Sequence, residues 1–147
     1  MVSLMSHTCT CKNCLFNSEN AIFVARGKKS EFILENNKAK KVDKLIVDNC
    51  LLNAKTRAEK CDYLFRILDD SLIFLVECKG SDVLKAVSQI DSTITILKGE
   101  LNNFLVKGRI VSTRVHSPDL RSKEYKNLRA RLNSHLETKN IKLIEII

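Results

Sequence analysis

The stretch FLVECKGSD, from Phe74 to Asp82, constrains the fold most, because a long apolar run ends there in an acid and a base. Apolar residues dominate Leu72 to Cys78 (LIFLVEC), which predicts a buried strand in the centre of a sheet. Alternate residues of a strand point to the same face, so Glu77 and Lys79 project together while Cys78 faces the other way. The charged pair is therefore either a solvated strand end or half of a catalytic site.

The preceding residues predict that this strand is the second arm of a hairpin. Cys61 to Ile67 (CDYLFRI) form the first arm, and Asp69-Asp70 lie in the loop. With Asp69-Asp70 as a two-residue loop, Leu68 pairs with Ser71, and the pairing of all other residues in the two arms follows. A four-residue loop gives the same pairs.

That register places Asp62 directly opposite Glu77, on the face that also carries Lys79. Facing residues have Cβ atoms about 5 Å apart, and two facing carboxylates repel unless a cation lies between them. Mg²⁺ suits this position because it binds through one or two carboxylates together with substrate phosphate. A nearby lysine would stabilise negative charge on an attacking hydroxide or on the phosphate. The pattern thus predicts a site that cleaves phosphodiester bonds.

The tripeptide Glu-x-Lys is weak evidence by itself, since the chain contains it three times. Glu124-Tyr-Lys126 and Glu137-Thr-Lys139 are expected in or near a helix, where the two side chains diverge. The competing interpretation of Glu77 and Lys79 is a surface ion pair, which contributes little to stability. A charged pair ending a central strand, opposite an aspartate, favours the catalytic interpretation.

The rest of the chain predicts one α/β domain over residues 1–147, with a central mixed sheet flanked by helices. We expect residues 1–20 to be a mobile, cysteine-containing N-terminus. The other expected elements are strands over Glu31 to Leu34, Lys44 to Leu52, Arg109 to Val115 and Ile141 to Ile147, a helix from a Ser81 cap to Gly99, and a helix opened by Ser117-Pro118-Asp119 with the stripe Tyr125, Leu128, Leu132 and Leu136.

The net charge and the hydropathy of the chain restrict the kinds of binding partner that we expect. The net charge of +8 over 147 residues favours a polyanionic partner such as nucleic acid. No apolar stretch reaches the ~18 residues of a membrane span, and the start MVSLMSHTC does not resemble a secretory signal. We therefore expect a cytoplasmic protein without a membrane partner.

An aspartate, a hairpin, and then Glu-x-Lys at a strand end before a helix resemble the PD-(D/E)XK nuclease superfamily, from about Lys44 to Ile147. The resemblance implies a restriction-endonuclease-like fold and a nuclease that depends on Mg²⁺ or Mn²⁺, with DNA favoured over RNA. It implies that Asp62, Glu77 and the backbone carbonyl of Cys78 are metal ligands.

By the same resemblance Lys79 is the catalytic lysine, and Gln89 is the polar residue that the following helix contributes. Lys85, one turn earlier on that helix, is a weaker candidate for contact with phosphate.

Two departures from the superfamily pattern are visible. Cys61 stands where the motif has proline, and the further acidic residue of many members could be Glu19, Glu31 or Glu35. Asp48 is interpreted as a turn or edge residue.

Alternatives remain open at this point. A catalytically silent module of the same fold would bind nucleic acid or protein, and a structural or regulatory partner protein would carry its basic charge incidentally. A nuclease of this size could act as a homodimer, or a partner protein could supply its target.

The cysteines fall into two groups. Cys9, Cys11 and Cys14 form a C-x-C-x-x-C cluster that offers three metal ligands, but a closed zinc site needs a fourth and His7 is the only histidine nearby. Incidental thiols are therefore favoured over metal binding. The other three, Cys50, Cys61 and Cys78, are expected to be small buried hydrophobic residues.

Overall fold

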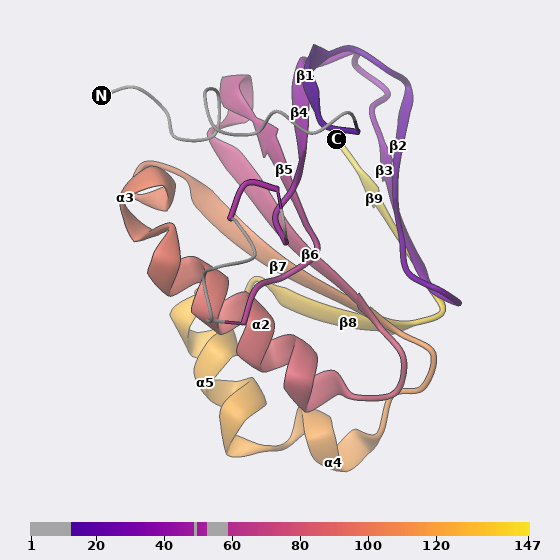
Figure 1. Ribbon diagram of the computed structural model, residues 1–147, viewed down its shortest axis with the longest axis vertical. Helices are drawn as coiled ribbons and strands as arrows, with labels where there is room; N and C mark the ends of the chain where they lie inside the picture. The colour runs from indigo at the N-terminus through magenta and orange to yellow at the C-terminus, as the bar shows by residue number, and fades with distance from the viewer. Residues whose placement is uncertain (1–12, 49, 53–58) are drawn as a thin grey trace.

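The computed structural model describes residues 13–48, 50–52 and 59–147 (Figure 1). Residues 1–12, which include Cys9 and Cys11, lie outside the described residues. The expected mobile N-terminus also contains Leu15–Ser18, and these residues form strand β1.

The larger sheet is mixed. It has the strand order β1-β4-β5-β6-β7-β8. Neighbouring strands are antiparallel from β1 to β6 and parallel from β6 to β8. The strands after β1 are β4 (Val42–Ile46), β5 (Tyr63–Ile67), β6 (Leu72–Lys79), β7 (Leu105–Ser112) and β8 (Leu136–Asn140).

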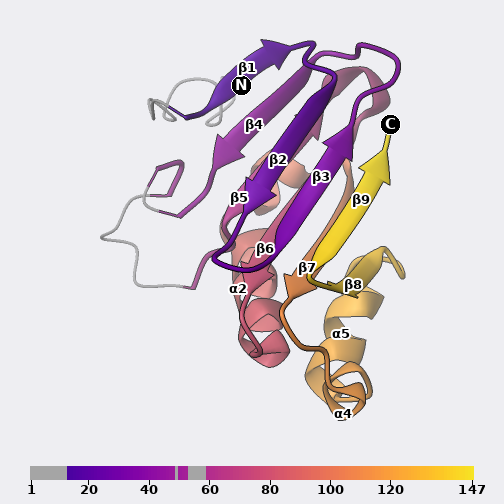
Figure 2. The same ribbon diagram turned by 90° about the vertical axis from the view of Figure 1, so that its right-hand side faces the viewer.

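A small second sheet covers one face of the larger sheet, and helices cover the other (Figure 2). Its strands are β2 (Ile22–Arg26), β3 (Glu31–Glu35) and β9 (Lys142–Ile146), in the order β2-β3-β9. The helices are α2 (Val83–Ile96), α3 (Lys98–Leu101), α4 (Ser117–Leu120) and α5 (Lys123–Arg131). The predicted single α/β domain with a mixed sheet is confirmed, but helices flank only one of its faces.

Two hydrophobic cores explain why the β6 sequence is apolar without alternation. Ile73 and Leu75 pack into the core under the helices, whereas Phe74 and Val76 pack against the small sheet. The Phe74 ring lies 5.9 Å from the Phe32 ring of β3. A strand that is covered on both faces has no solvent side on which polar residues could recur.

The predicted hairpin register is confirmed. Tyr63 pairs with Val76 and Ile67 pairs with Leu72, as the expected pairing requires. The loop is a short 3₁₀ turn, η1 (Leu68–Asp70), followed by Ser71 at a φ of 49°.

The helix boundaries differ from the expectation. Asp82, not Ser81, caps α2, since its side chain accepts a hydrogen bond from the Lys85 backbone N–H. Gly99 does not end the helical region, because it lies inside α3. Only α4 begins at Ser117, and Ser122 caps the separate helix α5.

Several strands also differ from the expectation. The strand expected from Lys44 to Leu52 begins at Val42 and ends at Ile46. Leu136 belongs to β8, as do Glu137 and Lys139, whose side chains share a face and form an ion pair of 3.8 Å. The expectation that this Glu-x-Lys pair diverges on a helix was therefore wrong.

Candidate functional site

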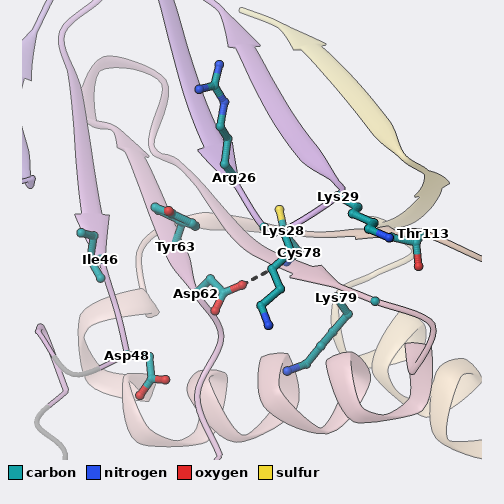
Figure 3. Close-up of a pocket in the computed structure, with 12 residues that line it drawn as sticks. Arg26, Lys28, Lys29, Ile46, Asp48, Asp62, Tyr63, Cys78, Lys79 and Thr113 are labelled. Atoms are coloured by element: carbon teal, nitrogen blue, oxygen red, sulfur yellow. Dashed lines mark hydrogen bonds between the residues drawn. The ribbon is translucent and has the colours of Figure 1, made fainter.

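The end of the β5–β6 hairpin borders a cavity of about 680 Å³ (Figure 3). The turn between β2 and β3 forms the opposite wall, so both sheets contribute to the cavity. Its charged lining residues are Arg26, Lys28, Lys29, Asp48, Asp62 and Lys79. Carboxylates and cations thus line the same cavity, as a site for a metal-bound phosphate requires.

Asp62 is the carboxylate at the cavity wall. Its Oδ2 accepts a hydrogen bond of 3.2 Å from the Cys78 backbone N–H, which ties the start of β5 to the end of β6. Burial raises the pKa of the Asp62 carboxyl above its usual value, although that hydrogen bond and the charge of Lys79 oppose the shift. The carboxylate therefore keeps one fixed partner and still borders the cavity.

Glu77, the second carboxylate of the predicted pair, lies near the end of β6 and is 0% exposed. Neither of its carboxylate oxygens accepts a hydrogen bond from the residues that the structure describes. The Lys79 Nζ lies 3.4 Å from Glu77 Oε1, which is an ion pair without hydrogen-bond geometry. Burial, and then the charge of Asp62, raise the pKa of Glu77 to about 8.

Gln89 reaches the same region from α2. Its Nε2 donates a hydrogen bond of 3.2 Å to the Lys60 carbonyl, two residues before Asp62. Its Oε1 is buried and has no hydrogen-bond donor among the described residues. The predicted helix residue therefore anchors the segment that carries Asp62, but it is not part of the cavity wall.

The donor set fits a divalent cation in part. Among the described residues no three His, Cys, Asp or Glu side chains come close enough together to hold a metal. However, Mg²⁺ can bind through one or two carboxylates with water and phosphate completing its shell, and the Glu77 oxygens need such a partner. Two hard carboxylates therefore fit Mg²⁺ or Mn²⁺ better than softer metals. The predicted role of the Cys78 carbonyl as a ligand stays a prediction.

Sequence analysis missed the basic residues at the connection between β2 and β3: Arg26 ends β2, and Lys28 and Lys29 lie in the turn. Gly27 allows this turn to lie against the hairpin, because a Cβ there would come within 2.9 Å of the Cys78 Cβ. The signal was present as a basic cluster around a glycine in ARGKKS, but the sequence did not show that it faces Asp62.

Asp48 was interpreted as a turn or edge residue. It lies two residues after the end of β4, forms an isolated parallel β-bridge with Leu52, and lines the cavity. Its Oδ1 lies 3.5 Å from the Nζ of Lys60. Its negative charge contributes to the raised pKa of Asp62. Asp48 therefore adds a second carboxylate to the lining of the cavity.

The other candidate residues do not line the cavity. Lys85 is paired with Glu59, so it is not directed at the predicted metal site. Glu31 forms ion pairs with Arg26 and Lys142. The remaining two possible acidic residues, Glu19 and Glu35, are not among those lining the cavity.

Comparisons with known proteins assign no family. No protein-family model matches the chain, and neither curated proteins nor solved structures give a match. In the described part of the chain, no helix is both long and apolar enough to cross a membrane. The functional argument therefore depends on the site itself.

Proposed function

We propose that this protein is a nuclease that uses Mg²⁺ or Mn²⁺ to hydrolyse phosphodiester bonds, with DNA favoured over RNA as substrate. The observation that carries the proposal is the pair of apposed carboxylates, Asp62 and Glu77, with Lys79 beside them. This arrangement, on a strand pair followed by a helix, supports a restriction-endonuclease-like fold of the PD-(D/E)XK type.

The burial of Glu77 supports a functional role. Glu77 is a buried carboxylate without hydrogen bonds from the described residues. Such a group lowers stability on the order of 1–3 kcal/mol, and by more when it is charged. An apolar residue of similar size would avoid that cost. Strongly shifted carboxyl groups beside a cavity are typical of catalytic and metal sites.

Each residue has a distinct part in the proposed reaction. Asp62 and Glu77 would hold the divalent cation, which when bound supplies charge neutralisation and an activated water. Lys79 places its ammonium beside this pair, where it would stabilise negative charge on the phosphate in the transition state. Gln89 is a positioning residue, because it holds the backbone just before Asp62.

The cations of the opposite wall would bind the substrate backbone. Lys28 and Lys29 are exposed and line the cavity, as does Arg26 at the end of β2. Contacts with phosphate oxygens give affinity without sequence preference. A homodimer, or a partner protein that supplies the target, would be needed for specificity or for cutting both strands.

The decisive experiment compares metal binding and cleavage in three variants. Calorimetry with Mg²⁺ and Mn²⁺ is run beside cleavage of plasmid DNA and of RNA. We expect Glu77→Gln to lose metal binding and cleavage. Lys79→Ala should keep metal binding within a few-fold but lose cleavage by about 100-fold or more, because the ammonium acts on transition-state charge.

Lys139→Ala is the matched control, since it removes the lysine of another Glu-x-Lys pair on a strand. It should cleave like the wild type. A folded wild-type protein that neither binds metal nor cleaves would overturn the proposal.

A second candidate is a catalytically silent module that binds nucleic acid. It is favoured by one observation: Glu77 is fully buried and does not line the cavity. In that case the wild type and Glu77→Gln would bind nucleic acid equally, and neither would cleave it.

A further inference from the structure

A second cavity continues from the cavity at the candidate site. Its volume is about 590 Å³, and residues of β1, β2, β4 and β5 line it, among them Val24 and Lys44. Arg26, Ile46 and Tyr63 line both cavities, so the two are contiguous (Figure 3). We call the second cavity the β2 groove, because it lies along β2, an edge strand of the small sheet (Figure 2). A substrate chain held at the candidate site can therefore continue into the β2 groove.

The floor of the β2 groove is a part of the larger sheet that the small sheet does not cover. Ile46 pairs with Tyr63, and Lys44 pairs with Phe65, which packs into the core under the small sheet. Paired residues share a face, so the Lys44 side chain lies on the face that the small sheet covers. Lys44 and Tyr63 are nevertheless only partly buried, whereas Phe65 is fully buried. The larger sheet thus extends past β2 at these two residues.

One side chain spans the β2 groove. The Lys44 Nζ, from β4, donates a hydrogen bond of 2.7 Å to the Val24 carbonyl of β2. The ammonium also lies 5.4 Å from the centroid of the Tyr63 ring. The floor and the β2 wall are therefore no farther apart there than one lysine side chain can reach. A DNA duplex, whose major groove alone is about 12 Å wide, is too wide to enter this gap, but a single strand can lie along it.

The charge of the β2 groove suits phosphate. Its charged lining residues are Arg26 and Lys44, and no acidic residue in the described part of the chain lines it. Burial, and then the charge of Arg26, lower the pKa of the Lys44 ammonium, so an anion beside it would be stabilising. An ammonium has three N–H donors, and the Val24 carbonyl accepts from one of them. Lys44 can therefore bind a phosphate oxygen and keep its bond to β2.

We propose that the β2 groove binds an unpaired nucleic-acid strand that leads to the bond cleaved at Asp62 and Glu77. This inference rests on the proposed nuclease function and specifies its substrate class. The substrate is a single strand, or a duplex with a single-stranded extension, and not a continuous duplex. Lys44 is the residue that binds the phosphate backbone of the unpaired strand beside the reacting bond.

The test measures binding in EDTA, so that it does not depend on cleavage. Fluorescence anisotropy compares the affinity of the full-length wild type for a single-stranded DNA oligonucleotide, a blunt duplex of the same sequence, and that duplex with a single-stranded extension. We expect the two probes with an unpaired strand to bind about tenfold more tightly than the blunt duplex, which is the effect of one hydrogen bond to a charged group.

Lys44→Gln should lower the affinity for the single strand by about tenfold, and the steepness of log K against log salt by about 0.7, because one phosphate contact is lost. Glutamine can still donate to the Val24 carbonyl, so the variant should fold. The matched control is Lys107→Gln. Lys107 is also a partly buried strand lysine over an aromatic ring, that of Phe74, but it does not line the β2 groove. This control should bind like the wild type.

A second measurement needs no variant. Wild-type protein in EDTA is treated with an amine-acetylating reagent, with and without the single strand, and mass spectrometry measures the modification of each lysine. We expect the strand to slow the acetylation of Lys44 and to leave that of Lys107 unchanged. Equal affinities for the single strand and the blunt duplex, or no protection of Lys44, would overturn the proposal.

Failure of this inference differs from failure of the proposed function. If the single strand binds through Lys44 but is not cleaved in Mg²⁺ or Mn²⁺, the nuclease proposal is wrong and the β2 groove is a binding site for unpaired strands. If the protein cleaves blunt duplex DNA and Lys44→Gln cleaves and binds like the wild type, the nuclease proposal stands and the assignment of the β2 groove is wrong.

Discussion

At the residue scale, Glu77 is a buried carboxylate whose two oxygens accept no hydrogen bond from the described residues. It is fully buried, Asp62 directly precedes the facing strand β5, and Lys79 is its only ion-pair partner among the described residues. Removing a carboxylate from water disfavours its charged form, and a second carboxylate disfavours it further. These two effects together raise its pKa to about 8.

This shift predicts a pH-dependent stability in the absence of divalent cations. The pKa of Glu77 is about 8 in the folded protein and near 4.5 in the unfolded chain. The folded state therefore binds the proton more tightly, so the contribution of Glu77 to stability is fully present below about pH 4.5 and is lost as the pH rises through 8. Glu77→Gln, which stays neutral, removes this dependence.

The measurement is urea unfolding in EDTA at pH 5.5 and at pH 9, for the wild type and Glu77→Gln. We expect similar stabilities at pH 5.5 and an advantage for Glu77→Gln on the order of 3 kcal/mol at pH 9. Comparing the two proteins cancels the titration of all other groups. Parallel stability profiles would show that Glu77 is ionised in the folded state at neutral pH.

At the scale of elements, the turn between β2 and β3 brings the small sheet into the site. Gly27 lies against Cys78 at the end of β6, and its backbone N–H donates to the Ser30 carbonyl at 2.8 Å. This close approach places Lys28 and Lys29 in the lining of the same cavity as Asp62. The hairpin and the turn therefore form one unit, although they belong to different sheets.

The corresponding prediction concerns Gly27→Ala. The added Cβ would lie 2.9 Å from the Cys78 Cβ and 3.1 Å from the Cys78 carbonyl oxygen. Backbone must move to relieve this overlap, so we expect a loss of about 1–3 kcal/mol in the free energy of unfolding. Affinity for nucleic acid should fall as well, because the turn shifts.

Gly99→Ala is the matched control, since an added Cβ at Gly99 meets nothing within 4 Å and α3 favours alanine. The measurement is thermal unfolding of both variants and of the wild type. Equal melting temperatures for Gly27→Ala and the wild type would mean that the turn does not pack against the hairpin in solution.

At the scale of the whole molecule, the charge is distributed unevenly around the site. The net charge of +8 attracts polyanions in general, but the cavity collects Arg26, Lys28, Lys29 and Lys79 from two sheets. Binding to phosphate releases condensed counterions, so affinity falls steeply with salt.

We therefore expect nucleic-acid affinity to depend on lysines of the cavity and not on charge alone. Replacing Lys28 and Lys29 with alanine should lower the slope of log K against log salt by about 1.8 for duplex DNA. Lys123→Ala/Lys126→Ala, which removes the same charge from α5, should change the slope far less. Fluorescence anisotropy over a salt series measures both, and equal slopes would contradict a cavity-centred interface.

The sequence by itself determined the hairpin that carries the site. Residue alternation and a short loop are local properties, so the pairing of β5 with β6 and the shared face of Asp62, Glu77 and Lys79 could be derived without a structure. The apolar run of β6 likewise predicted its central position. Asp48 could be predicted to be a turn or edge residue, but its place at the cavity could not be predicted.

Tertiary structure alone decided what surrounds that hairpin. β9 pairs with β3 from the opposite end of the chain, the basic turn at Gly27 faces Asp62, and Cys50 lies beside Cys14. Each of these contacts joins segments that are far apart in the sequence. The residue pattern within a segment sets which of its faces is buried, whereas its partner is selected by the packing of the whole chain.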